Sequence, residues 1–135
     1  MAEMTKVEIK RLLPADLPLM RALLSTFGRA FDDLESYEGK QPSDAYLSSL
    51  LANPTFFALV ALKDDTVIGG LAGYELQKFE QERSEFYIYD LAVEEAQRRQ
   101  GIATALIGEL QQLAKARGAW VTFVQADYDD PPAIA

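Results

Sequence analysis

The fold of this chain is decided by the stretch Tyr89-Asp90-Leu91-Ala92-Val93, followed after a short polar loop by Arg98-Arg99-Gln100-Gly101-Ile102-Ala103-Thr104. We interpret the first run as the end of a strand and the second as the start of an amphipathic helix. A helix start has unpaired N–H groups and a partial positive charge, so sequences usually place a capping oxygen and acidic residues there. Here two arginines precede the helix, and no acidic residue appears until Glu109. This pattern predicts a site for the pyrophosphate of a nucleotide-type cofactor. Two solvated arginines in a surface loop are the alternative.

Composition limits the chemistry. The chain has 135 residues, of which 49% are hydrophobic, so we expect one globular domain with a substantial core. It has no apolar run long enough to span a bilayer, and its first ten residues lack the apolar stretch of a signal peptide, so we expect a cytoplasmic protein. The absence of Cys and His excludes disulfides, thiolate nucleophiles, imidazole bases and the commonest metal ligand. Catalysis must therefore use carboxylates, hydroxyls, Lys, Arg or backbone groups.

The charge of the chain restricts its partners. The net charge is −8, which argues against nucleic acid or an anionic membrane and is compatible with a cationic substrate. The acidic residues gather in three segments, 32–38, 75–85 and 127–130. For any single cluster, a solvated surface is the favoured interpretation.

Hydrophobic periodicity predicts the elements. We expect strands over 7–12, 56–62, 67–74, 85–93 and 120–126, with 63–66 as a hairpin turn. We expect helices from Asp16 to near Gly28, from Ser43 to Asn53-Pro54, and from about Ile102 to Arg117 with Gly118 as the residue after its end. The glycines at 69, 70 and 73 weaken their strand unless something approaches its backbone closely. The last helix should bury Ile102, Ala105, Leu106, Leu110, Leu113 and Ala114.

This order of elements predicts an α/β fold. The last two strands should be parallel, because a helix connects them. Ligands bind at the carboxyl ends of parallel strands, so we expect 90–93, the Arg98 loop and 127–130 to lie at one edge. The acidic loop between the first two helices contains Tyr37 and lacks periodicity. It could line a substrate site or be a mobile connector.

Several runs carry a family resemblance. The motif Arg98-x-x-Gly101-x-Ala103 resembles the acetyl-CoA motif of the GNAT superfamily of N-acetyltransferases. Longer runs resemble the aminoglycoside 3-N-acetyltransferases of the gentamicin-resistance type, and the similarity extends from the first strand to residue 135. These runs are Lys78-Phe79-Glu80-Gln81, Arg83-Ser84-Glu85, Tyr87-Ile88-Tyr89-Asp90-Leu91-Ala92-Val93, 98–107 and Val124-Gln125-Ala126-Asp127-Tyr128.

The resemblance implies a fold, an activity and a cosubstrate. The fold would be one GNAT domain over 1–135, with a mixed central sheet flanked by helices. The activity would be acetyl transfer from acetyl-CoA, without a metal, to the 3-amino group of 2-deoxystreptamine aminoglycosides such as gentamicin, which is an antibiotic-resistance activity.

The resemblance also implies site residues. Backbone groups of Leu91, Ala92 and Val93 would hold the pantetheine arm. The side chains of Arg98 and Arg99, with the amides of Arg99, Gln100, Gly101, Ile102, Ala103 and Thr104, would hold the pyrophosphate. Asp90 matches the general base, and Asp127 with Asp130 matches acids near the amine substrate.

Elementary chemistry agrees with a carboxylate base. An amine bound as its ammonium form is not a nucleophile, and a chain without His needs a carboxylate to accept the proton. We expect Asp90 on the same strand face as Phe86 and Ile88, where desolvation would raise its pKa. The alternative for Asp90 is a strand-end residue that pairs with an arginine. For Asp127, Asp129 and Asp130 it is helix capping before Pro131-Pro132.

The chain departs from the family at its C-terminus. In the family, the segment after Pro131 continues as a helix that carries a tyrosine able to protonate the departing thiolate, and two more strands follow. This sequence stops at Ala135, and Tyr128 is not at the matching place. We therefore expect a truncated C-terminal helix and sheet with an open edge, which a homodimer could complete. Two other functions stay open: acetylation of a polyamine or another small polycation, and CoA binding without turnover.

Overall fold

The structure is a computed structural model that describes residues 6–123. The order of its elements agrees with the α/β order predicted from the sequence. The described elements are β1 (Val7–Arg11), η1 (Pro14–Asp16), α1 (Leu17–Ala30), η2 (Glu35–Gly39), α2 (Asp44–Ala52), β2 (Phe56–Lys63), β3 (Thr66–Gln77), β4 (Ser84–Val93), η3 (Glu95–Gln97), α3 (Ile102–Ala116) and β5 (Trp120–Phe123).

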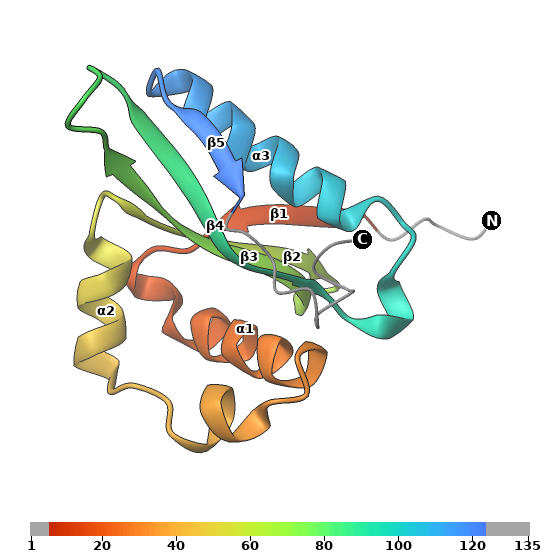
Figure 1. The fold of residues 1–135 in the computed structure, drawn as a ribbon. Coiled ribbons are helices and arrows are strands. Elements are labelled where there is room, and N and C mark those ends of the chain that lie inside the picture. The colour runs from red at the N-terminus through yellow and green to blue at the C-terminus, as the bar shows by residue number, and fades with distance from the viewer. Residues whose placement is uncertain (1–5, 124–135) are drawn as a thin grey trace.

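One twisted sheet forms the centre of the molecule (Figure 1). Its strand order is β1-β2-β3-β4-β5; the first four strands are antiparallel, and β5 runs parallel to β4. The predicted hairpin is confirmed, with Asp64 and Asp65 in the left-handed region at the turn. The predicted parallel pair is confirmed too. Residues 124–126, which we expected to extend the last strand, lie outside the described residues.

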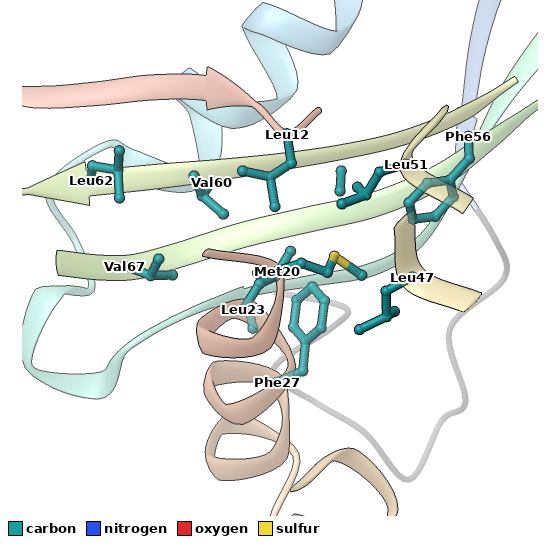
Figure 2. Packing of buried hydrophobic residues seen from close by; sticks show 12 residues of the cluster. Leu12, Met20, Leu23, Phe27, Leu47, Leu51, Phe56, Val60, Leu62 and Val67 are labelled. Carbon is teal, nitrogen blue, oxygen red and sulfur yellow. The ribbon is translucent and has the colours of Figure 1, made fainter. Parts of the chain in front are cut away.

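Helices cover both faces of the sheet, with α1 and α2 on one face and α3 on the other (Figure 1). Because side chains of a strand alternate between faces, β2 contributes to both cores and is buried almost throughout. Figure 2 shows the core under α1 and α2, which contains Leu12, Met20, Leu23, Phe27, Leu47, Leu51, Phe56, Ala58, Val60, Leu62, Val67 and Ala92. The core under α3 contains Phe57, Leu59, Ala61, Ile68, Leu71, Phe86, Ile88, Val93, Ile102, Leu106, Leu110 and Ala114.

The ends of α1 differ from the sequence prediction. Asp16 precedes the helix, but its carboxylate accepts a bond from the amide of Leu13 (2.8 Å) and pairs with Lys10 (3.1 Å) instead of capping α1. The helix continues past Gly28 to Ala30. Gly28 is a close-approach residue and not a terminator, because a Cβ there would lie 3.1 Å from side-chain atoms of Leu34 and Tyr37.

The other helix ends follow their predicted signals. Ser43 caps α2 by accepting a bond from the amide of Tyr46 at 3.2 Å. After α3, Gly118 has φ +68°, and the amides of Gly118 and Ala119 donate to the carbonyls of Lys115 and Ala114. The prediction that Ala105 is buried is wrong: it is exposed, because the buried stripe steps along 102, 106, 110 and 114, and adjacent residues lie about 100° apart.

Close approach to the backbone of β3 accounts for its glycines. A Cβ at Gly70 would lie 2.3 Å from Cδ1 of Leu23 on α1 and 2.6 Å from the carbonyl oxygen of Leu59. A Cβ at Gly73 would lie 2.3 Å from the carbonyl oxygen of Tyr87. Helix α1 therefore sits directly on the strand beside β4. None of the helices between residues 6 and 123 is long and apolar enough to cross a membrane.

Candidate active site

A bulge in β4 decides where Asp90 points. Ala72 of β3 pairs with Asp90, whereas the next residue, Gly73, pairs with Ile88, so Tyr89 is an extra residue in β4. Before the bulge, Phe86 and Ile88 enter the core under α3. After it, the alternation is reversed, and Asp90 lies on the opposite face, under α1 and α2. The expectation that Asp90 shares a face with Phe86 and Ile88 is wrong for this reason.

Asp90 is half-buried and accepts a hydrogen bond from a tyrosine. The hydroxyl of Tyr37 donates to Oδ2 of Asp90 at 3.1 Å. Burial raises the pKa of Asp90, because the charged carboxylate loses water, and the bond from Tyr37 acts against this increase. Burial and the nearby carboxylate raise the pKa of Tyr37 to about 12. Within the described residues, Asp90 forms no ion pair with an arginine or lysine.

An aromatic pocket opens beside this carboxylate. Its volume is about 530 Å³. The rings of Tyr74 and Tyr89 meet edge to face with centroids 5.2 Å apart. The ring centroids of Tyr74 and Phe56 are also 5.2 Å apart. Such a pocket can receive an amine, because the carboxylate attracts the ammonium form and can accept its proton. The lining residues are Phe56, Ala72, Tyr74, Leu76, Tyr89 and Asp90.

The acidic loop between α1 and α2 reaches the site through Tyr37. The ring of Tyr37 packs against Phe27 (centroids 6.1 Å apart) and Phe31 (5.8 Å). Its carbonyl oxygen accepts a bond from Nε2 of Gln41 at 3.1 Å. The loop therefore contacts the carboxylate of the site through Tyr37, although none of its residues lines the pocket. The contact of Tyr37 with Asp90 was not predicted; the available signal was one aromatic residue within an acidic, non-periodic loop.

The start of α3 has the features of an anion site. Gly101 precedes the helix with φ +75° and open space around its α-carbon, and Arg99 is also left-handed at φ +67°. The amides of residues 99–104 donate to no acceptor within the described part of the chain, and the first turn contains no acid. A 220 Å³ pocket lies here, lined by Val93, Gln97, Arg98, Arg99, Gly101, Ile102, Ala103 and Thr104.

The anion pocket adjoins the end of β4. Nε of Arg98 donates to the carbonyl oxygen of Val93 at 3.1 Å, which ties the loop to the strand. The structure thus brings 90–93 and 98–104 to one end of the sheet. Asp127 and Asp130, predicted to approach the same end, lie outside the described residues.

The two buried acidic residues of segment 75–85, Glu75 and Glu85, have structural partners. Glu75 is buried and pairs with Arg117 at 2.6 Å. Glu85 is buried and accepts bonds from Arg83 (2.9 Å) and from the hydroxyl of Tyr87 (2.8 Å). These two carboxylates are therefore already occupied by partners within the fold.

Comparison with known proteins identifies the family. The model of the Acetyltransferase (GNAT) family matches residues 18–135. The chain belongs to this family. GNAT enzymes use acetyl-CoA, and the GNAT fold consists of an antiparallel four-strand sheet flanked by helices, as β1–β4 show here. A comparison with functionally curated proteins finds no match.

Solved GNAT structures resemble this one closely. An aminoglycoside acetyltransferase from an uncultured soil metagenomic sample is 56% identical, with a TM-score of 0.91 over 96% of this chain and 86% of that one. A second such enzyme, solved in complex with sisomicin, is 36% identical, with a TM-score of 0.85 over 95% and 82%. A predicted acetyltransferase from Clostridium acetobutylicum, solved with acetyl-CoA, shares the fold at 22% identity and a TM-score of 0.68 over 95% and 86%.

Proposed function

We propose that this GNAT enzyme transfers the acetyl group of acetyl-CoA to the 3-amino group of 2-deoxystreptamine aminoglycosides such as gentamicin. One observation carries the proposal: the half-buried carboxylate of Asp90 lines an aromatic pocket, and the end of its strand meets a set of amides that donate to no acceptor within residues 6–123. Similarity to two aminoglycoside acetyltransferases supports the substrate class.

The pyrophosphate of acetyl-CoA binds at the start of α3. The amides of Arg99 to Thr104 donate to its oxygens, and the exposed guanidinium of Arg99 adds charge. Two features support this assignment: the left-handed backbone at Gly101, which leaves the approach free of a side chain, and the absence of any acid in the first turn. The bond from Arg98 to Val93 sets the loop against β4.

The pantetheine arm adds to the outer edge of β4. The amide of Glu94 donates to the carbonyl oxygen of Ile68 on β3. Along an antiparallel strand, the N–H and C=O groups of alternate residues point toward and away from the partner strand, so those of Leu91 and Val93 point away from β3. Ala92, between them, keeps the strand paired to β3. On this edge, β5 pairs only with residues 85–88 of β4. Within residues 6–123, the part of the edge formed by residues 89–93 therefore has no neighbouring strand. An extended amide-bearing arm suits such an edge.

Asp90 accepts the proton that the amine must lose. Acetyl-CoA supplies an activated thioester. The ammonium form of the substrate gives one proton to Asp90, directly or through water, and the free amine attacks the thioester carbonyl carbon. An N–C bond forms, the C–S bond breaks, and a second proton leaves the nitrogen while the CoA thiolate takes up a proton. The raised pKa of Asp90 suits it to this exchange.

The substrate's other ammonium groups bind carboxylates. We assign this role to Asp127 and Asp130, as the resemblance implies, and the net charge of −8 favours a polycation. A charged pair shielded from solvent contributes more than an exposed one, so acids beside the pocket are better suited than the general acidic surface.

Steady-state turnover with acetyl-CoA and a panel of aminoglycosides tests the proposal. Gentamicin should be acetylated, and spermidine should be a poorer substrate. Faster turnover of spermidine would establish the polyamine alternative. CoA binding without turnover on any amine would show a binding protein and contradict the proposed activity.

A further inference from the structure

We propose that Tyr37 is a positioning residue for Asp90: its hydroxyl holds one carboxylate oxygen and leaves the other to receive the proton of the amine. This inference rests on the proposed function, because it concerns the same carboxylate. It starts from the bond between the Tyr37 hydroxyl and Oδ2 of Asp90, which joins residues 53 positions apart in the chain. Within the described residues, no hydrogen bond engages Oδ1, so this oxygen can accept a proton.

Helix α1 places Tyr37 independently of Asp90. Phe27 and Phe31 hold one side of its ring, and Gln41 fixes its backbone carbonyl. Gly28 lets the Tyr37 backbone approach α1, since a Cβ there would lie 3.1 Å from the Cβ of Tyr37. Because these contacts do not involve the hydroxyl, Tyr37→Phe keeps the ring in place and removes only the bond to Asp90.

The groups around Asp90 leave Tyr37 as its specific partner. Tyr74 of β3 and Tyr89 of β4 bring phenol rings to the same pocket, and Tyr46 of α2 lies near Tyr74. The negative charge of Asp33, which precedes η2, contributes to the raised pKa of Tyr37.

Both arginines of α1 are engaged elsewhere, because Arg21 pairs with Asp44 of α2 and Arg29 pairs with Glu94 at 2.5 Å. Helix α3 covers the opposite face of the sheet. Within the described residues, the hydroxyl of Tyr37 is the hydrogen-bond donor to this carboxylate.

Tyr37 also stabilises the charged form of the base. With a pKa of about 12, its hydroxyl stays protonated and donates throughout the range in which enzymes are assayed. Donation to a carboxylate favours ionisation, so the pKa of Asp90 is lower than burial alone would make it. Removing the hydroxyl should therefore raise the pKa of Asp90 and shift the acidic limb of kcat/KM to higher pH.

The test compares Tyr37→Phe with Tyr46→Phe, which removes a hydroxyl from an exposed ring that does not bond Asp90. Two readouts are measured: the pH profile of gentamicin acetylation, and the titration of the Asp90 carboxyl carbon by NMR, assigned with Asp90→Asn. For Tyr37→Phe we expect both midpoints to move to higher pH. We also expect roughly a 10-fold lower plateau kcat, the scale of one charge-assisted hydrogen bond, at an unchanged KM for acetyl-CoA.

Three outcomes are decisive. Tyr46→Phe should keep the midpoints and the plateau kcat of the parent enzyme. The changes seen in Tyr37→Phe would then come from the loss of the Tyr37 hydroxyl. If the parent is active and Tyr37→Phe, folded by its thermal transition, keeps both midpoints and the plateau, Tyr37 does not position the base. If the parent acetylates no aminoglycoside, the proposed function fails, and the positioning role fails with it.

Discussion

Replacing Gly101 with Asp puts a carboxylate where the cosubstrate's phosphate is proposed to bind. Gly101 lies at the N-cap of α3, next to amides that donate to no acceptor within residues 6–123. An Asp side chain at an N-cap accepts bonds from such amides, so it would occupy the donors and repel the ligand at the same time. The change should therefore weaken CoA binding strongly.

The size of the effect follows from two contributions. A left-handed φ of +75° costs an L-residue about 1–2 kcal/mol, a cost that Ala and Asp both carry. A carboxylate about 5 Å from a phosphate oxygen adds about 3 kcal/mol of repulsion at an effective dielectric constant near 20. That repulsion corresponds to about a 100-fold higher Kd, because about 1.4 kcal/mol changes the Kd tenfold.

Isothermal titration calorimetry with CoA measures this effect, and Gly101→Ala is the matched control. Ala adds the backbone strain without the charge, and open space surrounds the position, so no clash intervenes. We expect Gly101→Asp to bind CoA about 100-fold more weakly than Gly101→Ala. Equal affinities for the two variants would refute the placement of the pyrophosphate at α3.

The remaining predictions concern the base, the substrate acids and the packing of the sheet. Asp90→Asn should lower kcat by about 10²-fold and leave CoA binding intact; a rate near that of the parent would make Asp90 a structural residue. Because the pKa of Asp90 is raised in the folded state, its ionisation costs stability as pH rises from the unfolded pKa through the folded one. The same variant should therefore melt at a higher temperature than the parent at neutral pH and not at strongly acidic pH. Asp127→Asn and Asp130→Asn should raise KM for gentamicin but not for acetyl-CoA, whereas equal changes for both substrates would indicate damaged folding. In thermal unfolding, Gly70→Ala should destabilise the fold by about 1–3 kcal/mol, because its Cβ would meet Leu23 and Leu59. Gly108→Ala, in open space on α3, should stabilise it by about 0.5–1 kcal/mol; the opposite order would contradict the described packing.

Local patterns in the sequence predicted most of the fold. A continuous apolar run marks β2, buried residues repeat along α3 with the period of a helix, and turn residues mark the hairpin at Asp64-Asp65. The proposed anion site was predictable as well, since Arg98, Arg99 and Gly101 are neighbours in sequence, and the local backbone that they share forms the start of α3.

Features that depend on contacts between distant parts of the chain could not be predicted from the sequence. The extra residue at Tyr89 breaks the two-residue period of β4, and no pattern within the strand marks it, so Asp90 was assigned to the wrong face. The contact of Tyr37 with Asp90 depends on how α1 seats on the sheet, which sets the path of the following loop. Gly28 resembled a helix terminator because a close contact with Tyr37 and a left-handed turn both favour glycine.

We propose that this GNAT enzyme acetylates the 3-amino group of a 2-deoxystreptamine aminoglycoside. The most direct test is to incubate the chain with acetyl-CoA and gentamicin, purify the product, and locate the new amide by mass spectrometry and NMR. We expect one added acetyl group, on the 3-amino nitrogen, in a reaction that Asp90→Asn slows. An acetyl group on a different nitrogen would contradict the assigned position, and gentamicin recovered unmodified would contradict the claim itself.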